Sequence, residues 1–221
     1  VNMIHFIAKK IKNLCIKVNY RWKSFHERRK LQYIDFSIIS NNCWAGFVYS
    51  KFGLEYTTPT IGMGIVDDDY IKFLENMDYY LNLTPQFIDP KSAKDYEIRR
   101  RLYGREIDYP VARLDDIVLW FTHYSSPKEA LSKWERRKKR INKNRMLVKW
   151  SQRYNQSPAL LERFLCLPFK NKIAFVEPSC PINDPRVIKI PELEELNVKG
   201  GDETESTLRL IDIYHLLNSL Q

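Results

Sequence analysis

The sequence predicts an α/β fold in which a mainly parallel sheet lies between two layers of helices. From residue 33 onward, apolar runs of strand length alternate with amphipathic helical patterns. Strands separated by helices are joined by right-handed crossovers, which leave the strands parallel and the helices on both faces of the sheet. The chain has 221 residues, of which 44% are hydrophobic and 13% aromatic, enough for the core of one medium-sized domain.

The first half of this predicted domain opens with an apolar, β-branched run. Its predicted strands cover residues 33–40, 60–66 and 109–113, and its predicted helices cover residues 43–52 and 67–81. Gly53 ends the first helix, because glycine tolerates the left-handed backbone of a helix C-cap. Three aspartates at residues 67–69 open the second helix, since acidic side chains stabilise a helix start.

The second half contains the clearest buried strand, residues 117–124. The predicted strands of this half cover residues 117–124, 146–151, 172–176 and 187–190, and the predicted helices cover residues 126–141, 158–165 and 207–220. Ser126 is a good N-cap, with Pro127 in the first turn and Glu129 three residues after the serine. Residues 178–205 are rich in Pro and Glu, and we expect them to be irregular apart from the short strand.

Positive charge is concentrated at the N-terminus. Residues 1–30 hold nine of the 36 Lys and Arg residues but only one of the 27 acidic ones, Glu27, so this segment carries eight of the nine net charges. An apolar stripe recurs there at helical spacing: Ile4, Ile7, Ile11, Leu14, Val18, Trp22 and Phe25. We therefore divide the chain into a basic amphipathic helical segment, residues 1–32, and a single α/β domain, residues 33–221.

Two interpretations of this helix stay open. It either lies on an anionic membrane surface or packs on the domain or on a second subunit. No apolar run approaches the roughly 20 residues needed to span a bilayer, and lysines interrupt any signal-peptide core. We expect a cytoplasmic protein, with attachment at the inner face of the membrane left open. Nucleic acid is not expected as a partner because no recognised binding module accompanies the basic residues.

The cysteines and histidines predict neither a metal site nor a cofactor. The four cysteines form no C-x-x-C pair, the four histidines have no metal-ligand spacing, and no glycine-rich phosphate loop is present. Sparse cysteines in a chain of this length favour a reducing environment. The three aspartates at 67–69 resemble a D-x-D metal motif weakly, but a favourable helix start explains them better.

The candidate chemistry is a thiol and an imidazole at one edge of the sheet. Cys43 follows the first strand, where the backbone N–H groups of a helix start lower a thiol pKa, and His123 ends the 117–124 strand. Ligands bind at the carboxyl ends of parallel strands. His123 would activate the Cys43 thiol, Asp116 would orient the ring, and Asn41 and Asn42 would supply an oxyanion hole. The alternative is that Cys43 and His123 merely pack.

A cationic segment follows on the next helix, where Arg136, Arg137, Lys138, Lys139 and Arg140 are consecutive. Arg136 and Arg140 share a helix face that could bind phosphate or carboxylate. Trp134 and Asn142 flank this segment and complete the predicted substrate-binding set with Asn41, Asn42, Arg136, Arg137 and Arg140.

The order of these motifs resembles a known bacterial family, the domain of unknown function 1919. The motifs are Ile38–Gly46, Thr58-Pro59-Thr60, Asp69–Phe73, Tyr109-Pro110-Val111, Phe121–Ser126, Glu129-Ala130, Trp134–Arg137 and Arg140-Ile141-Asn142. The resemblance covers roughly residues 33–180. It implies an α/β fold and, because members are often labelled exopolysaccharide biosynthesis proteins, a setting in capsule or exopolysaccharide assembly. It implies no particular reaction.

Three functions follow as hypotheses. The leading one is an enzyme that uses Cys43 and His123 for acyl transfer or hydrolysis on an anionic glycan precursor or sugar phosphate. The second is a glycosyl- or phosphoglycosyl-transferase that binds a sugar nucleotide. The third is a non-catalytic assembly component that docks on a membrane or a partner through residues 1–30. The oligomeric state is not predicted.

Overall fold

Four parallel strands form the central sheet of the structure, a computed structural model that describes residues 2–104, 106–199, 201 and 203–220. Their order across the sheet is β1 (Ser37–Ser40), β5 (Met146–Ser151), β6 (Asn171–Val176) and β7 (Val187–Lys189). Each neighbouring pair is parallel. All four strands were predicted, β5 with the bounds observed, because each is an apolar run in a helix-rich surrounding.

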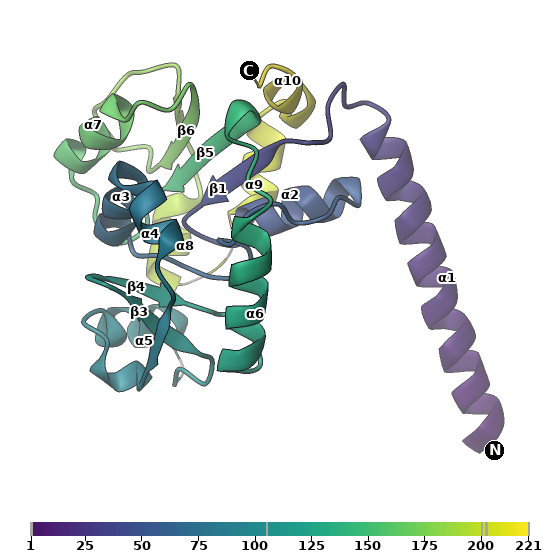
Figure 1. Cartoon of the computed structure of the whole chain (residues 1–221). Coiled ribbons are helices and arrows are strands. Elements are labelled where there is room, and N and C mark those ends of the chain that lie inside the picture. The colour runs from purple at the N-terminus through teal and green to yellow at the C-terminus, as the bar shows by residue number, and fades with distance from the viewer. Residues whose placement is uncertain (1, 105, 200, 202, 221) are drawn as a thin grey trace.

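Helices cover both faces of this sheet, which confirms the predicted α/β architecture (Figure 1). Residues alternate between the two faces: Ile38 and Leu147 pack in one core, Ile39 and Val148 in the other. The first core contains residues of α2 (Trp44–Phe52), α8 (Leu193–Lys199) and α10 (Ile213–Asn218). The second contains residues of α3 (Asp67–Glu75), α4 (Met77–Asn82), α6 (Pro127–Lys138) and α7 (Pro158–Cys166).

A second, antiparallel sheet contains β2 (Gln86–Ile88), β3 (Val111–Leu114) and β4 (Ile117–Trp120). The prediction that residues 117–124 form one strand of the parallel sheet is therefore wrong. Only Asp115 and Asp116 separate β3 from β4, and Asp115 has a φ of 57°. A two-residue turn with a left-handed residue joins antiparallel strands, whereas parallel strands need a long crossover.

Several other predicted boundaries differ. Residues 60–66 form a turn at 60–62 and an irregular segment with one bridge from Gly64 to Trp120, instead of a strand. The predicted helix 67–81 breaks at Asn76, and the predicted helix 207–220 divides into α9 (Thr204–Leu210) and α10, which Asp212 caps through two backbone N–H groups. The structure also contains α5 (Tyr96–Tyr103), the short helices η1 (Pro90–Ser92) and η2 (Lys143–Arg145), and α8 within residues predicted to be irregular.

The N-terminal helix α1 (Asn2–Arg28) projects away from the body and meets it near the C-terminal end of α2 (Figure 1). It confirms the predicted helix. The side chains of Ile4, Ile7 and Ile11, part of the predicted apolar stripe, lie outside the described residues. None of the described helices has the length and apolarity required to cross a bilayer.

Candidate active site

The candidate site forms where β1 and β5 end side by side. Ser40 pairs with Lys149 at the end of β1, and the chain continues into Asn41, Asn42 and Cys43. Cys43 is the N-cap of α2, with helical φ and ψ of −72° and −8°, and its carbonyl accepts from the N–H of Gly46. The thiol thus lies at the start of a helix and at the carboxyl edge of a parallel sheet, where ligands bind in such folds.

Cys43 and His123 line the same two cavities, of about 280 and 330 Å³. The Cys43 Sγ lies 3.8 Å from the Oγ1 of Thr122, the residue before His123. Cys43 is half-buried and His123 is exposed. The structure therefore brings the predicted pair to a common space, although β4 is not a strand of the parallel sheet.

A turn at Gly62 holds the His123 segment against Cys43. The carbonyl of Gly62 accepts from the His123 N–H at 3.0 Å and from the Thr122 hydroxyl at 3.3 Å. Gly62 has a φ of +73°, and a Cβ at this position would lie 3.4 Å from the Cβ of His123. Glycine is favoured because an L side chain rarely adopts this backbone conformation, and its Cβ would come closest to the Tyr124 ring, at 3.3 Å.

A cationic wall, formed by Lys133 and Arg137 of α6, borders the first cavity. Arg137 is 5% exposed, and its guanidinium donates to the Tyr124 hydroxyl at 2.7 Å and lies 4.8 Å from the Tyr56 ring centroid. Lys133, one turn earlier, forms an ion pair with Glu129 at 2.5 Å. Fixed cations beside an open space can bind phosphate or carboxylate.

The predicted phosphate-binding face of Arg136 and Arg140 is not the one that borders this cavity. Arg136 is exposed, and Arg140 pairs with Glu55 at 2.5 Å. The helix α6 ends at Lys138, so Arg140 lies beyond it, and the helix face that borders the cavity contains Lys133 and Arg137, four residues apart. Of the three predicted arginines, only Arg137 lines the space that contains Cys43.

The structure does not bring Asp116, Trp134 or Asn142 to this space. Asp116 precedes β4 and His123 follows it, so the length of the strand separates them. The Asp116 carboxylate instead accepts from Lys72 at 2.7 Å and from Tyr80 at 2.6 Å, and the Lys72 bond lowers its pKa.

Trp134 is 1% exposed and packs in the core. Asn142 lies at the amino end of the sheet, where its side-chain amide donates to the Asp35 carbonyl at 2.7 Å and its backbone N–H to the Ser37 hydroxyl at 2.8 Å. Both residues hold the fold together at a distance from Cys43.

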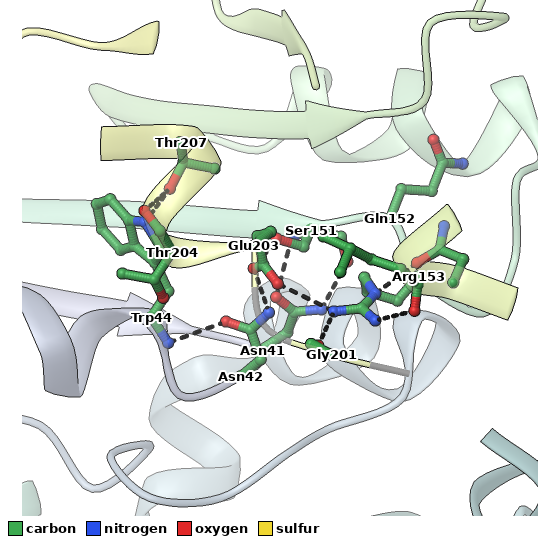
Figure 2. A network of polar contacts seen from close by, with 12 residues as sticks. Asn41, Asn42, Trp44, Ser151, Gln152, Arg153, Gly201, Glu203, Thr204 and Thr207 are labelled. Carbon is green, nitrogen blue, oxygen red and sulfur yellow. Dashed lines mark hydrogen bonds and ion pairs between the residues drawn. The ribbon is translucent and has the colours of Figure 1, made fainter. Parts of the chain in front are cut away.

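The loop that carries Cys43 joins a largely buried polar network, in which Figure 2 shows Asn41, Asn42, Ser151, Arg153 and Glu203. Lys149 belongs to the same network. The Lys149 ammonium donates to the Asn42 Oδ1 at 2.9 Å and to Glu203 at 2.8 Å. Arg153 donates to the other Glu203 oxygen at 2.9 Å. Burial alone would raise the pKa of Glu203, but the charges of Lys149 and Arg153 outweigh it and hold this pKa below its usual 4.5.

The two asparagines belong to this network. The Asn41 amide donates to the Ser151 carbonyl at 2.8 Å and accepts from the Ser151 N–H at 3.0 Å. The Asn42 amide donates to Glu203 at 2.6 Å, while its oxygen accepts from the Trp44 N–H at 3.2 Å. In the structure these hydrogen bonds fix the loop that carries Cys43, whereas the sequence predicted oxyanion-hole donors.

Lys149, Arg153 and Glu203 were not predicted as site residues from the sequence. Lys149 could have been found, because it is a charged residue within the mostly apolar strand 146–151. A charged side chain in a buried strand needs a partner of opposite charge. Glu203 gave no such signal, since it lies in the acidic stretch 202–205, where any one acid is like its neighbours.

The aspartates at 67–69 are used inside the protein. The Asp67 carboxylate is fully buried and accepts from the backbone N–H groups of Arg153, Tyr154 and Asn155 at 2.6–2.9 Å. Burial raises the pKa of Asp67 to about 6, although hydrogen bonds from these donors lower it. Asp69 pairs with Lys94 at 2.5 Å. Among the described residues, no group of three or more His, Cys, Asp or Glu side chains is arranged to hold a metal ion.

Fold and site together define an α/β protein with a thiol, an imidazole and a cationic wall at the carboxyl edge of its parallel sheet. Residues 14–209 match the family described as "Domain of unknown function (DUF1919)". The chain belongs to this family, which confirms the resemblance drawn from its motifs. A Haemophilus influenzae protein, named "Uncharacterized protein", is similar as well, with 28% identity over 167 residues that make up 74% of each chain.

Proposed function

We propose that this protein is an enzyme of exopolysaccharide or capsule biosynthesis that uses the Cys43 thiol for acyl transfer or hydrolysis on an anionic glycan or its precursor. The observation that carries the proposal is the shared lining of two cavities by Cys43 and His123. A thiol at a helix start, with an imidazole across the same space, is the minimal unit of thiol catalysis.

In the proposed reaction, the Cys43 thiolate attacks the carbonyl carbon of an activated acyl donor, an ester or a thioester. A C–S bond forms, the bond to the leaving group breaks, and protonated His123 gives its proton to the departing alcohol or thiol. A glycan hydroxyl, or water for hydrolysis, then attacks the thioester. His123 accepts its proton, and the thiolate leaves as the ester or acid forms.

The substrate side of the proposal rests on the cationic wall. Arg137 is held by the Tyr124 hydroxyl and the Ile61 carbonyl, so its position is fixed before a ligand arrives. Lys133 borders the same cavity from the preceding helical turn. A phosphate or carboxylate on the glycan precursor would meet both cations there, within the space that Cys43 lines. The assignment to surface polysaccharide comes from the family resemblance.

The experiment measures alkylation of each cysteine by iodoacetamide as a function of pH, with peptide mass spectrometry to separate Cys43 from Cys166. Cys166 is an exposed free thiol in α7 and serves as the reference within the same chain. We expect Cys43 to titrate below the ordinary thiol value of roughly 8.5 and to react about tenfold faster than Cys166 at neutral pH.

The matched variants are His123→Ala and His215→Ala, both at exposed histidines. His123→Ala should return the Cys43 rate to that of Cys166, and His215→Ala should leave it unchanged. A Cys43 that reacts no faster than Cys166 and does not respond to His123→Ala would refute the thiol mechanism. Unchanged polysaccharide output from a Cys43→Ala strain would also refute it.

A further inference from the structure

The helix α1 meets the body through polar residues on one of its faces. The Tyr20 hydroxyl donates to the Ser50 carbonyl at 2.5 Å, the Ser24 hydroxyl donates to the same oxygen at 3.4 Å, and Glu27 pairs with Lys51 at 2.9 Å. Ser24 is buried against Gly53, where an added Cβ would come within 2.9 Å of the Ser24 Cβ. This contact fixes α1 to the C-terminal end of α2.

A different face of α1 carries the apolar stripe. Leu14, Val18, Trp22 and Phe25 are 62%, 58%, 63% and 47% exposed. At about 100° per residue, their mean direction lies roughly 150° from that of Tyr20, Ser24 and Glu27. The stripe is therefore turned away from the body, and the contact with α2 does not explain why these positions are apolar.

The charges around the apolar stripe argue against the α1 helix of a second copy of this chain packing on it. Glu27 is the only acidic residue among residues 1–30, and it already accepts from Lys30, Lys51 and Tyr214 within the protein. Two such helices packed together would bring their seven cations each into proximity without acidic partners. A partner surface with an apolar interior and negative charge at its boundary would complement both the apolar stripe and the cations of α1.

We propose that α1 lies in the interface of an anionic lipid membrane, with Leu14, Val18, Trp22 and Phe25 inserted among the acyl chains. Exposed cations that flank the stripe, which include Lys10 and Arg21, face the lipid headgroups. Trp22 suits this position because its ring is amphipathic. The body is then held at the membrane through Tyr20, Ser24 and Glu27.

Vesicle flotation of the full chain tests this proposal. We expect it to bind vesicles of equal phosphatidylcholine and phosphatidylglycerol, to bind phosphatidylcholine vesicles at least about tenfold more weakly, and to lose affinity as salt rises.

The matched variants are Val18→Asp and Ile16→Asp. Both residues are apolar and nearly equally exposed, 58% and 57%, and both changes remove one net positive charge, but Ile16 lies on the side of α1 opposite the stripe. We expect Val18→Asp to weaken vesicle binding about fiftyfold and Ile16→Asp about fivefold. Circular dichroism checks that both variants keep the helix and the body folded.

Three results would overturn the proposal. One is no preference for anionic vesicles by the wild-type chain. Another is equal loss of binding in the two variants, which would mean that charge alone acts. The third is a concentration-dependent dimer in sedimentation, or duplex DNA binding, that accounts for the helix while vesicles are not bound.

Discussion

Two polar regions border Cys43, and they differ in how their charges are satisfied. In the buried polar network, the one carboxylate of Glu203 pairs with both Lys149 and Arg153, and Arg153 and Glu203 also line the second cavity. At the cavity, His123 is exposed and Lys133 keeps about a third of its side-chain surface, while Arg137 is anchored but still lines the space. The comparison teaches that charge at the carboxyl edge of a sheet serves two purposes. The charges of the network hold the loop that carries Cys43, whereas Lys133 and Arg137, each held by a neighbour, border the first cavity.

The largest effect that would test this comparison is the removal of Glu203. Glu203→Ala leaves Lys149 and Arg153 buried beside each other without their shared counter-charge, so we expect unfolding to become easier by about 3–5 kcal/mol. Glu205→Ala, at an exposed acid in the same helix, should change stability by less than about 0.5 kcal/mol. Urea unfolding followed by circular dichroism measures both. A loss below about 1 kcal/mol for Glu203→Ala would contradict the structural role of the network.

The second expected effect is a loss of folding stability at acid pH, through protonation of Glu203. The pKa of Glu203 is lower in the folded protein than the 4.5 of the unfolded chain. The unfolded state therefore takes up a proton first as the pH falls, so the stability due to this carboxylate is complete above about pH 4.5 and is lost progressively below it.

Glu203→Gln keeps the shape of the side chain but cannot titrate. Its unfolding free energy should therefore fall less steeply than that of the wild type below about pH 4.5, although the other acids titrate in both proteins. Urea unfolding at a series of pH values gives the two curves. Parallel curves for the two proteins would show that Glu203 does not contribute to acid sensitivity.

The smallest effect sharpens the comparison at the cavity. Arg137→Ala removes the donor to the Tyr124 hydroxyl and the Ile61 carbonyl, so we expect a loss of about 2 kcal/mol in unfolding free energy. Arg136→Ala, at the exposed neighbour, should stay within about 0.5 kcal/mol. Thermal unfolding with and without inorganic phosphate checks a second point, since only Arg137→Ala should also remove any stabilisation by phosphate. Equal changes in stability and in phosphate stabilisation for the two variants would show that Arg137 is no more important for binding phosphate than Arg136.

The sequence by itself determined the elements of the parallel sheet and the place of the thiol. Continuous apolar runs, helical spacing, and turn and capping residues are signals that depend only on neighbouring residues. For this reason β5, α2 and the start of α6 at Ser126 were predicted close to their observed bounds. Cys43 could be placed at a strand-to-helix corner for the same reason. The helix α1 and its apolar stripe were also predicted from spacing alone.

Only the tertiary structure decided which of these pieces meet. The sequence assigned the 117–124 run to the wrong sheet, because an apolar run does not state its pairing partner. His123 nevertheless reaches the Cys43 cavities through the turn at Gly62, and Asp116 remains at the far end of β4. The choice of Arg137 over Arg136, and the meeting of Lys149 with Glu203, depend on contacts between residues distant along the chain. The physical reason is that local patterns fix secondary structure, whereas burial and charge pairing are settled by packing.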